Sequence, residues 1–458
     1  MNSKSAAYPL IDYPDLDRIM VYRPHTRITA GRFLVEAQRL AGRLGPAAHV
    51  LNLCQDRYHF MVGLAAAILA GKISLLPSTH TDDTLRQLFG TFPNSICLHD
   101  LPNWPHVYPQ IAYPVDEVEA VVDTPAPPIP LIDSARPVVY VFTSGSTGHP
   151  VPHIKTWGKL VLNSRTAAKA LGIHADPVSI VGTVPPQHMF GFESTVLLCL
   201  QGRCPIWSGK PFYPADIVAA LADMPEPRML VSTPFHLESL LDSGMTVPPV
   251  AQVLLATAPL AQDLAERAEQ QLNVPLREIY GCTETGQIAI RRPAESPAWA
   301  LFPGITLEAD YSDGEKWLYR AWGGHIEVPI ALSDRLEVLV DGRFLLLGRL
   351  ADQVNIAGKR SSLGFLTAQI KAIPGVTDGV FFQPEARAGQ AISRLCALVV
   401  APDMTQAEIL SALRTRLDPA FLPRPLILVE ALPYNDTGKL PRAQLLALLV
   451  HHRESLKR

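Results

Sequence analysis

The stretch Val141-Phe-Thr-Ser-Gly-Ser-Thr-Gly-His-Pro150 decides the fold of this chain. The apolar run 138–141 predicts a buried strand that leads directly into a loop of hydroxyls and glycines. Gly145 and Gly148 allow backbone amides to approach an anion closely. Four neighbours add hydroxyl donors: Thr143, Ser144, Ser146 and Thr147. No Gly-Lys-Ser/Thr follows the glycines, so this is not a Walker A loop, and the pattern predicts either another phosphate-holding loop or an ordinary polar turn.

On both sides of this stretch, short apolar strands alternate with helical patterns. Residues 28–44 and 58–70 have helical spacing, and each is followed by a short apolar run that predicts a strand. Similar units recur over residues 178–256, so we expect an α/β fold with a parallel sheet. After about residue 300 the sequence pattern changes and predicts short strands joined by Gly and Asp turns, for example at Asp341-Gly342.

Composition limits the class of protein. A length of 458 residues exceeds a single core, so at least two domains are expected. A net charge of -3 gives no reason to expect nucleic acid or an anionic membrane as a partner. The first ten residues have no apolar segment typical of a signal peptide, and no apolar run approaches membrane-spanning length. Six scattered cysteines without metal-site spacing complete the expectation of a cytoplasmic protein.

A second segment with chemical potential is Tyr280-Gly-Cys-Thr-Glu-Thr-Gly286, which again follows an apolar strand pattern. An aromatic ring can stack on a purine, Thr283 can donate to a phosphate, and the Glu284 carboxylate suits Mg²⁺. The alternative is a turn with a helix-capping Thr. Cys282 has no evident base beside it, so a small packed side chain is expected there rather than a nucleophile.

Two further segments lie towards the C-terminus. Asp334 is followed fourteen residues later by Gly348-Arg349, and an Asp after a strand suits the paired hydroxyls of a ribose. Gly438-Lys439 presents a lysine on a glycine-containing loop, where its ammonium is a mobile point charge. Each of these segments also has a plain structural interpretation, as a loop Asp and as a lysine that solvates a turn.

In this order the four segments resemble the adenylate-forming enzymes, which include acyl- and aryl-CoA synthetases, nonribosomal peptide adenylation domains and luciferases. The resemblance runs from Ala70-Gly71 to Gly438-Lys439. It implies that a carboxylic acid attacks the α-phosphate of ATP to give an acyl-adenylate, and that a thiol then takes the acyl group. It also implies a large N-terminal domain of parallel-rich α/β sheets plus a β-rich segment (1–348), a hinge (349–352) and a small mobile α+β domain (353–458).

The resemblance also implies roles for individual residues. Residues 143–148 would cradle the β- and γ-phosphates, while Tyr280 and Gly281 would lie at the adenine. Ala256 and Thr257 stand beside the adenine where relatives carry a glycine pair. Thr283 would contact the α-phosphate, and Glu284 would carry Mg²⁺.

Further roles concern the ribose, the acid and the thiol. Asp334 would hold the ribose hydroxyls, with Arg349 beside it. Lys439 would bridge the substrate carboxylate and the α-phosphate. His188, in Pro185-Pro-Gln-His-Met-Phe-Gly191, would lie near that carboxylate, with a packed histidine as the alternative, and Gly358 would border the thiol tunnel.

The chain departs from the family pattern at three places. Val151 stands where relatives usually have a lysine, and Lys155 lies nearby in a different register. Relatives usually have Asp or Lys at the hinge pivot, and here the candidates are Ala351 and Asp352. Serines follow Gly358-Lys-Arg360 where acidic residues are common, which weakens the prediction for the thiol side more than that for adenylation.

The nearest resemblance is to the standalone ligases of aryl polyene and xanthomonadin-type pigment pathways. It implies a hydroxybenzoate-like aryl acid and the phosphopantetheine thiol of an acyl carrier protein. CoA is the alternative acceptor, and a short or medium-chain fatty acid is the alternative substrate. A hypothesis of another class is a degenerate member that binds nucleotide without catalysis, as a sensor or scaffold.

Overall fold

The computed structural model describes residues 6–77, 80–118, 124–144, 150–258, 260–310, 318–349, 353–356, 359–384, 394–435 and 439–455. The chain divides into two compact units. The first is formed by Met1–Glu308 and Arg320–Ile330, and the second by Ala309–Tyr319 and Ala331–Arg458. Residues 350–352 of the predicted hinge lie outside the described residues, so the predicted boundaries at 348 and 353 stay predictions.

A six-stranded sheet in the first unit carries the strand of the phosphate loop. Its strand order is β10-β9-β5-β4-β6-β7, and all neighbours are parallel except β10, which pairs antiparallel with β9. The strands are β4 (His49–Asn52), β5 (Ile73–Leu76), β6 (Ser95–His99), β7 (Gln110–Ala112), β9 (Pro137–Ser144) and β10 (Pro150–Thr156).

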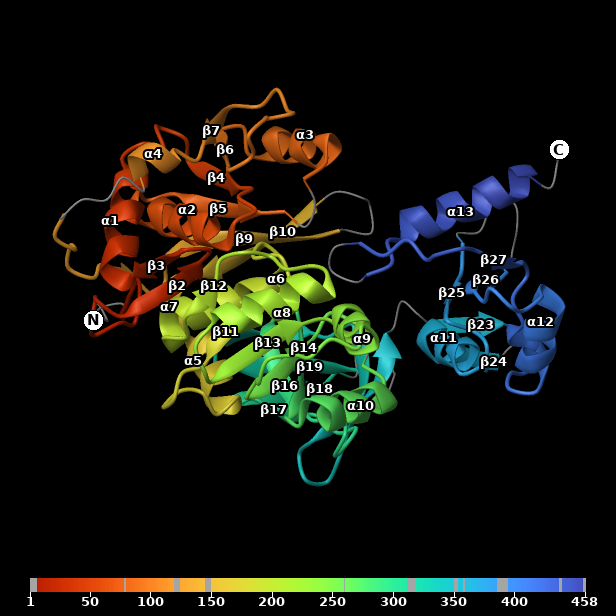
Figure 1. The fold of residues 1–458 in the computed structure, drawn as a ribbon. Coiled ribbons are helices and arrows are strands. Elements are labelled where there is room, and N and C mark those ends of the chain that lie inside the picture. Colours follow the sequence, from red (N-terminus) through yellow and green to blue (C-terminus); the bar gives the residue numbers. More distant parts are fainter. Residues whose placement is uncertain are drawn as a thin grey trace. The chain divides into compact units, whose positions relative to one another are not determined.

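Helices cover both faces of this sheet. Helix α3 (Asp82–Thr91) packs Leu85 and Leu88 into a core with side chains of β4, β5, β6 and β9. Helix α2 (Arg57–Leu69) is buried along almost its whole length, because α1 (Ala30–Ala41) lies on its other side (Figure 1). The Asp56 carboxylate accepts hydrogen bonds from two amides of the first turn of α2 and so fixes where this helix begins.

A nine-stranded sheet forms the second layer of the first unit. Its order is β17-β16-β15-β14-β13-β11-β12-β2-β3. The strands are β2 (Ile19–Arg23), β3 (Thr26–Thr29), β11 (Ser179–Gly182), β12 (Ile206–Trp207), β13 (Arg228–Ser232), β14 (Gln252–Leu255), β15 (Leu276–Cys282), β16 (Gly286–Arg291) and β17 (Ala300–Leu301). The six strands from β2 to β15 in this order are parallel, which confirms the predicted parallel-rich α/β fold.

Three helices cover one side of this sheet. Helices α8 (Pro214–Asp223), α9 (Pro234–Asp242) and α10 (Gln262–Leu272) share a core with side chains of β11, β13 and β14 (Figure 1). The remaining elements of this unit are shorter or connect the sheets: β1 (Ala7–Pro9), β8 (Leu131–Asp133), α4 (Val115–Val118), α5 (Trp157–Ala170), α6 (Met189–Gly191), α7 (Leu198–Gly202), β18 (Ile305–Ala309), β19 (Tyr319–Gly323) and β20 (Ile326–Ala331).

Within the α/β units predicted over residues 178–256, the helix that follows β11 has an unexpected form. Phe192–Leu197 is a π-helix, labelled η1, and only Leu198–Gly202 continues as an α-helix. A π-helix shifts the side chains that follow it around the helix axis and is frequent at functional sites. The spacing of apolar residues did not reveal it, because the segment is buried on all sides.

The second unit contains the predicted hairpin and a small α+β module. Strands β21 (Asp334–Val338) and β22 (Phe344–Arg349) are antiparallel around Asp341-Gly342, as predicted. Strands β25 (Asp378–Phe382), β26 (Cys396–Val400) and β27 (Leu426–Leu428) form a three-stranded sheet. The other elements are β23 (Gln353–Ile356), β24 (Lys359–Ser362), α11 (Leu363–Lys371), α12 (Gln406–Arg414) and α13 (Arg442–Ser455).

Alternation of side chains along β25 and β26 gives this three-stranded sheet two apolar faces. Phe381 packs with α11 and α12, whereas Phe382 packs with Leu445 and Leu449 of α13. Among the described residues of both units, no helix is long and apolar enough to cross a membrane.

Candidate active site

Three predicted site segments meet at one edge of the nine-stranded sheet. His188 lies beyond the carboxyl end of β11, Ala256 and Thr257 follow β14, and Tyr280 lies in β15. These strands are parallel, with β13 between β11 and β14, so their carboxyl ends lie at the same edge. That edge is where ligands bind in open α/β sheets.

The predicted phosphate loop begins at the end of β9. Thr143 and Ser144 are its last residues, and their backbones pair with Val151 and Pro150 of β10. The side chains of Thr143 and Ser144 are not described, and Gly145, Ser146, Thr147, Gly148 and the thiol-tunnel residue Gly358 lie outside the described residues. Their predicted contacts therefore stay predictions.

The second motif forms a tight turn between β15 and β16, where Cys282 pairs with Gly286. The Tyr280 ring is half-buried and lies 5.6 Å from the Trp299 ring, at an interplanar angle of 56°. Burial raises the pKa of Cys282 to about 11, and its sulfur lies 3.2 Å from the Thr285 hydroxyl. A protonated, hydrogen-bonded thiol agrees with the expected packing role of Cys282.

Glu284 connects this turn to the strand that follows the phosphate loop. Its Oε1 lies 3.6 Å from Nε2 of His153, and its carbonyl accepts a 2.9 Å hydrogen bond from the Lys155 ammonium. Both partners lie on β10, which belongs to the six-stranded sheet. The structure therefore brings the predicted magnesium residue beside β10, the strand that follows the predicted phosphate loop.

The donor set at Glu284 suits magnesium that arrives with a nucleotide. Mg²⁺ is usually held by one or two carboxylates together with substrate phosphates and water, rather than by a cage of protein ligands. The Glu284 side chain is 37% exposed. Within the described ranges no cluster of three His, Cys, Asp or Glu side chains is present that would bind a metal on its own.

Lys155 has a different position from the lysine that relatives place at residue 151. Val151 is largely exposed, whereas Lys155 is 6% exposed, and burial lowers the pKa of its ammonium. Its hydrogen bond to the Glu284 carbonyl makes it a brace between β10 and the second motif. The sequence indicated that Lys155 lies near the predicted phosphate loop but did not predict its hydrogen bond to Glu284.

Thr257 adopts a backbone conformation that favours glycine. Its φ is 82°, and a β-branched side chain is strained in this region. The strain agrees with the glycine that the resemblance implies for relatives at this position, and the predicted place beside the adenine stays a prediction. Its neighbour Ala256 is buried.

The segment around His188 is held by an arginine that sequence reasoning missed. His188 is half-buried and precedes α6, with extended backbone angles typical of a helix N-cap. Arg57 donates hydrogen bonds to the carbonyls of Gly182 and Val184, at 2.9 Å and 3.0 Å, and to the Thr195 hydroxyl. Burial lowers the pKa of Arg57 to about 10, so it remains charged while it fixes the end of β11.

A cavity of about 330 Å³ lies between Met189 and Glu284. Three buried polar residues that the motifs did not indicate also line it: Asn163, Glu193 and His325. One signal was available for Glu193, which is the only Asp, Glu, Lys or Arg between Pro185 and Gly202. Asn163 and His325 had no comparable signal, because neither lies near a motif.

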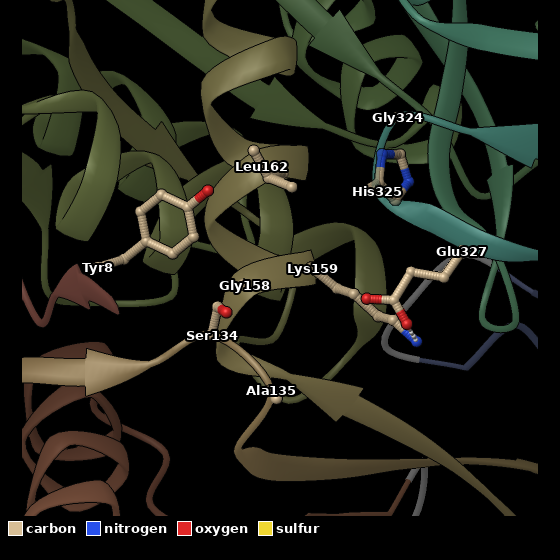
Figure 2. A pocket seen from close by; sticks show the side chains of 9 residues that line it. All are labelled: Tyr8, Ser134, Ala135, Gly158, Lys159, Leu162, Gly324, His325 and Glu327. Carbon is tan, nitrogen blue, oxygen red and sulfur yellow. Dashed lines mark ion pairs between the residues drawn. The ribbon is translucent and has the colours of Figure 1, made fainter. Parts of the chain in front are cut away.

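A second cavity of about 150 Å³ lies on the other side of Lys159 (Figure 2). Lys159 reaches from α5 to Glu327, and their ion pair of 3.0 Å is drawn beside His325. His325, Lys159 and Glu327 line both cavities. His325 therefore forms part of the wall of both cavities.

The second unit holds the other three predicted residues. Asp334 lies directly opposite Arg349 in the β21–β22 register, and their joint role at a ribose stays a prediction. Lys439 is exposed, and its backbone amide donates a 2.9 Å hydrogen bond to the side chain of Asn435. Their approach to the residues of the first unit stays a prediction.

Comparison with known proteins identifies the family. Residues 12–307 match the AMP-binding enzyme family. A 4-coumarate–CoA ligase of Rhodobacter capsulatus is 30% identical over 304 residues, covering 65% of this chain and 73% of that protein. A 4-chlorobenzoate–CoA ligase of an Arthrobacter species is 25% identical over 355 residues, covering 69% of this chain and 67% of that protein.

Solved structures share the fold over nearly the whole chain. O-succinylbenzoate coenzyme A synthetase of Bacillus subtilis, in complex with AMP, has a TM-score of 0.79 at 19% identity and covers 94% of this chain and 95% of its own. ATP-bound MatB of Rhodopseudomonas palustris has a TM-score of 0.79 at 18% identity and covers 95% of this chain and 96% of its own. These findings confirm the predicted resemblance to adenylate-forming ligases, and the chain belongs to the AMP-binding enzyme family.

Proposed function

We propose that this enzyme uses ATP to convert an aryl carboxylic acid into its acyl-adenylate, with release of pyrophosphate, and then passes the acyl group to a thiol. The observation that carries the proposal is the junction at Glu284, where the second motif meets β10, the strand that follows the predicted phosphate loop. The names of the two relatives above, ligases of 4-coumarate and 4-chlorobenzoate, support an aryl acid.

The chemistry requires two anions to meet. A carboxylate oxygen bonds to the α-phosphorus as the bond to the pyrophosphate oxygen breaks, so negative charge moves onto the leaving group. Preorganised donors lower such a barrier. In the proposal these are the hydroxyls and amides of residues 143–148, Thr283 and Lys439, while Mg²⁺ bound at Glu284 supplies further neutralising charge.

The nucleotide itself would lie along the edge formed by β14 and β15. Tyr280 offers its ring to the adenine next to Ala256 and Thr257, and Asp334 with Arg349 would take the ribose. His188 would orient the acid's carboxylate. The sulfur of the thiol then attacks the acyl carbon, forms a thioester, loses its proton and displaces AMP.

The acceptor has two candidates with the same reactive thiol. The resemblance to pigment-pathway ligases favours the phosphopantetheine arm of an acyl carrier protein. The relatives named above are CoA ligases, which supports CoA. A short or medium-chain fatty acid remains the alternative substrate.

Acid-dependent pyrophosphate release tests the proposal. The full-length protein is incubated with ATP, Mg²⁺ and a panel of aryl, fatty and amino acids, followed by CoA or a holo carrier protein with the best acid. We expect release with aryl acids and thioester formation with one of the two acceptors. Nucleotide binding without any acyl-adenylate would instead support the sensor or scaffold hypothesis.

A further inference from the structure

The cavity of about 330 Å³ is lined by a carboxyl group whose hydrogen bonding is incomplete. Glu193 is 3% exposed, and its Oε1 has no hydrogen-bond partner among the described residues. Burial raises the pKa of Glu193 to about 8, so the group is largely neutral at pH 7 and keeps a carbonyl oxygen that can accept a hydrogen bond. Leaving such a buried acceptor unpaired costs about 1–3 kcal/mol. A buried polar atom of this kind in a cavity therefore points to a ligand that supplies the missing donor.

Two other buried side chains converge on the same place from other elements. A Cβ built on Gly286 would lie 2.6 Å from Oε1 of Glu193, 2.6 Å from Nδ2 of Asn163 and 3.5 Å from Nε2 of His325. These residues come from η1, α5 and the connection between β19 and β20. The absent side chain of Gly286 leaves room for the three polar groups to meet.

His325 adds a second unpaired atom to this cluster. Its Nε2 lies 2.9 Å from the Thr285 carbonyl oxygen and 2.9 Å from Nδ2 of Asn163, so this nitrogen has two partners. Burial lowers the pKa of His325 to about 4, so the ring is neutral at pH 7. Its Nδ1 is buried and has no partner among the described residues.

The remaining wall of the cavity suits a ring. Ile154, Leu160, Met189 and Ile326 supply apolar surface, and Met189 directly follows His188. An apolar wall with a few converging polar groups is the usual composition of a small-molecule site, and about 330 Å³ is at the small end of the usual size range.

We propose that this cavity receives the ring of the substrate acid, and that Glu193 accepts a hydrogen bond from a ring hydroxyl, with Asn163 and His325 beside it. The inference rests on the proposed function and specifies its substrate as a hydroxylated aryl acid. Glu193 is then a specificity residue, because an acid without the hydroxyl leaves its Oε1 unpaired. Sites built to bind a hydroxyl discriminate strongly against analogues that lack it.

The first test needs no variant. Pyrophosphate release by the wild-type enzyme is measured with benzoate and with its 2-, 3- and 4-hydroxy derivatives. We expect kcat/KM for one of the hydroxy isomers to exceed that for benzoate about tenfold, the scale of one buried hydrogen bond. Equal values for benzoate and all three isomers would overturn the inference.

The second test assigns the preference to Glu193. Glu193→Gln keeps the size of the side chain and replaces one carboxyl oxygen with an amide nitrogen, and we expect the ratio of kcat/KM for the preferred isomer over benzoate to fall by roughly tenfold. Glu226→Gln is the matched control, since Glu226 is 64% exposed and lines neither cavity. The control should keep the wild-type ratio.

The outcomes separate the two proposals. If the wild type activates no acid of the panel, the proposed function fails, and the inference fails with it. If the wild type activates benzoate and hydroxybenzoates alike, or if Glu193→Gln folds and keeps the full wild-type ratio, only the role of Glu193 is lost. Circular dichroism of each variant establishes that it is folded before its ratio is used.

Discussion

Lys155 is the residue on which the junction of the two sheets depends. Its ammonium is buried, and it donates to the carbonyl of Glu284. We expect Lys155→Met to reduce pyrophosphate release by about 10²-fold, because a small displacement of a group that positions the reactants has effects of this size. Steady-state kinetics with saturating acid and varied ATP would measure the loss.

Lys169→Met is the control for this prediction. Lys169 is exposed in the last turn of α5 and lines neither cavity. Substitutions at such exposed positions change the free energy of unfolding by about 0.5 kcal/mol or less, so this variant should remain close to wild type. If both lysine variants lost activity equally, the loss would come from the removal of a positive charge in general. The proposed role of the hydrogen bond between Lys155 and Glu284 would then be refuted.

His325 predicts how stability depends on pH. Burial lowers its pKa from 6.5 to about 4, so the unfolded chain takes up a proton at a higher pH than the folded chain. Its contribution to stability is therefore present above pH 6.5 and is lost as the pH falls towards 4. The cations that further lower this pKa are Lys155 and Lys159.

The matched variant is His325→Gln, which cannot titrate. Between pH 7 and pH 5, the wild type should lose about 2 kcal/mol more unfolding free energy than this variant. Urea denaturation at pH 5, 6 and 7 measures the difference. Parallel pH profiles for the two proteins would show that His325 does not titrate as its burial requires.

At the residue scale, the sequence predicted what local motifs encode. Roles for Tyr280 and Glu284 could be predicted because a strand, a turn and a characteristic residue order occur together, and these roles stay predictions. Glu193, Asn163 and His325 are distant in sequence and become neighbours only when η1, α5 and the β19–β20 connection pack. Such a cluster has no local pattern, and only the isolated charge of Glu193 in an apolar run was available as a signal.

At the scale of elements, the turn that presents His188 depends on close backbone contact. A Cβ on Gly191 would lie 2.1 Å from the carbonyl oxygen of Pro185. We expect Gly191→Ala to lower the unfolding free energy by roughly 1–3 kcal/mol, the cost of overpacking. It should also raise the KM for the acid, because His188 lies between these two residues.

Gly90→Ala is the control for this substitution. Gly90 lies in helix α3, and a Cβ there would meet nothing within 4 Å. Alanine should stabilise the helix by about 0.5–1 kcal/mol. Thermal unfolding measures the stability of both variants, and kinetics at varied concentrations of the substrate acid measure their KM. An unchanged stability of Gly191→Ala would contradict the close contact between Gly191 and Pro185.

Strands with strong apolar patterns could be predicted closely, as β5 at Ile73–Leu76 demonstrates. The π-helix could not be predicted, because Phe192–Leu197 is buried on every side and its apolar residues have no distinguishing period. The strained φ of Thr257 was also hidden, although the glycine that relatives carry there was a hint. Hydrogen bonding and backbone geometry, rather than hydrophobicity, decide both features.

For the whole molecule, the central expectation is that Lys439 of the second unit completes the adenylation site of the first. Lys439→Ala should reduce acid-dependent pyrophosphate release by about 10²–10³-fold, the effect of removing one preorganised electrostatic donor. Because Lys439 is exposed, the variant should fold normally. It should also still transfer the acyl group when a synthetic acyl-adenylate is supplied together with the thiol, since that step needs no new bond to the α-phosphate. The control is Lys371→Ala, which removes an exposed ion pair with Asp378 in the same unit and should leave both half-reactions intact. Near-normal pyrophosphate release by Lys439→Ala would mean that another cation neutralises the reactants, and the assignment of this lysine would have to be abandoned.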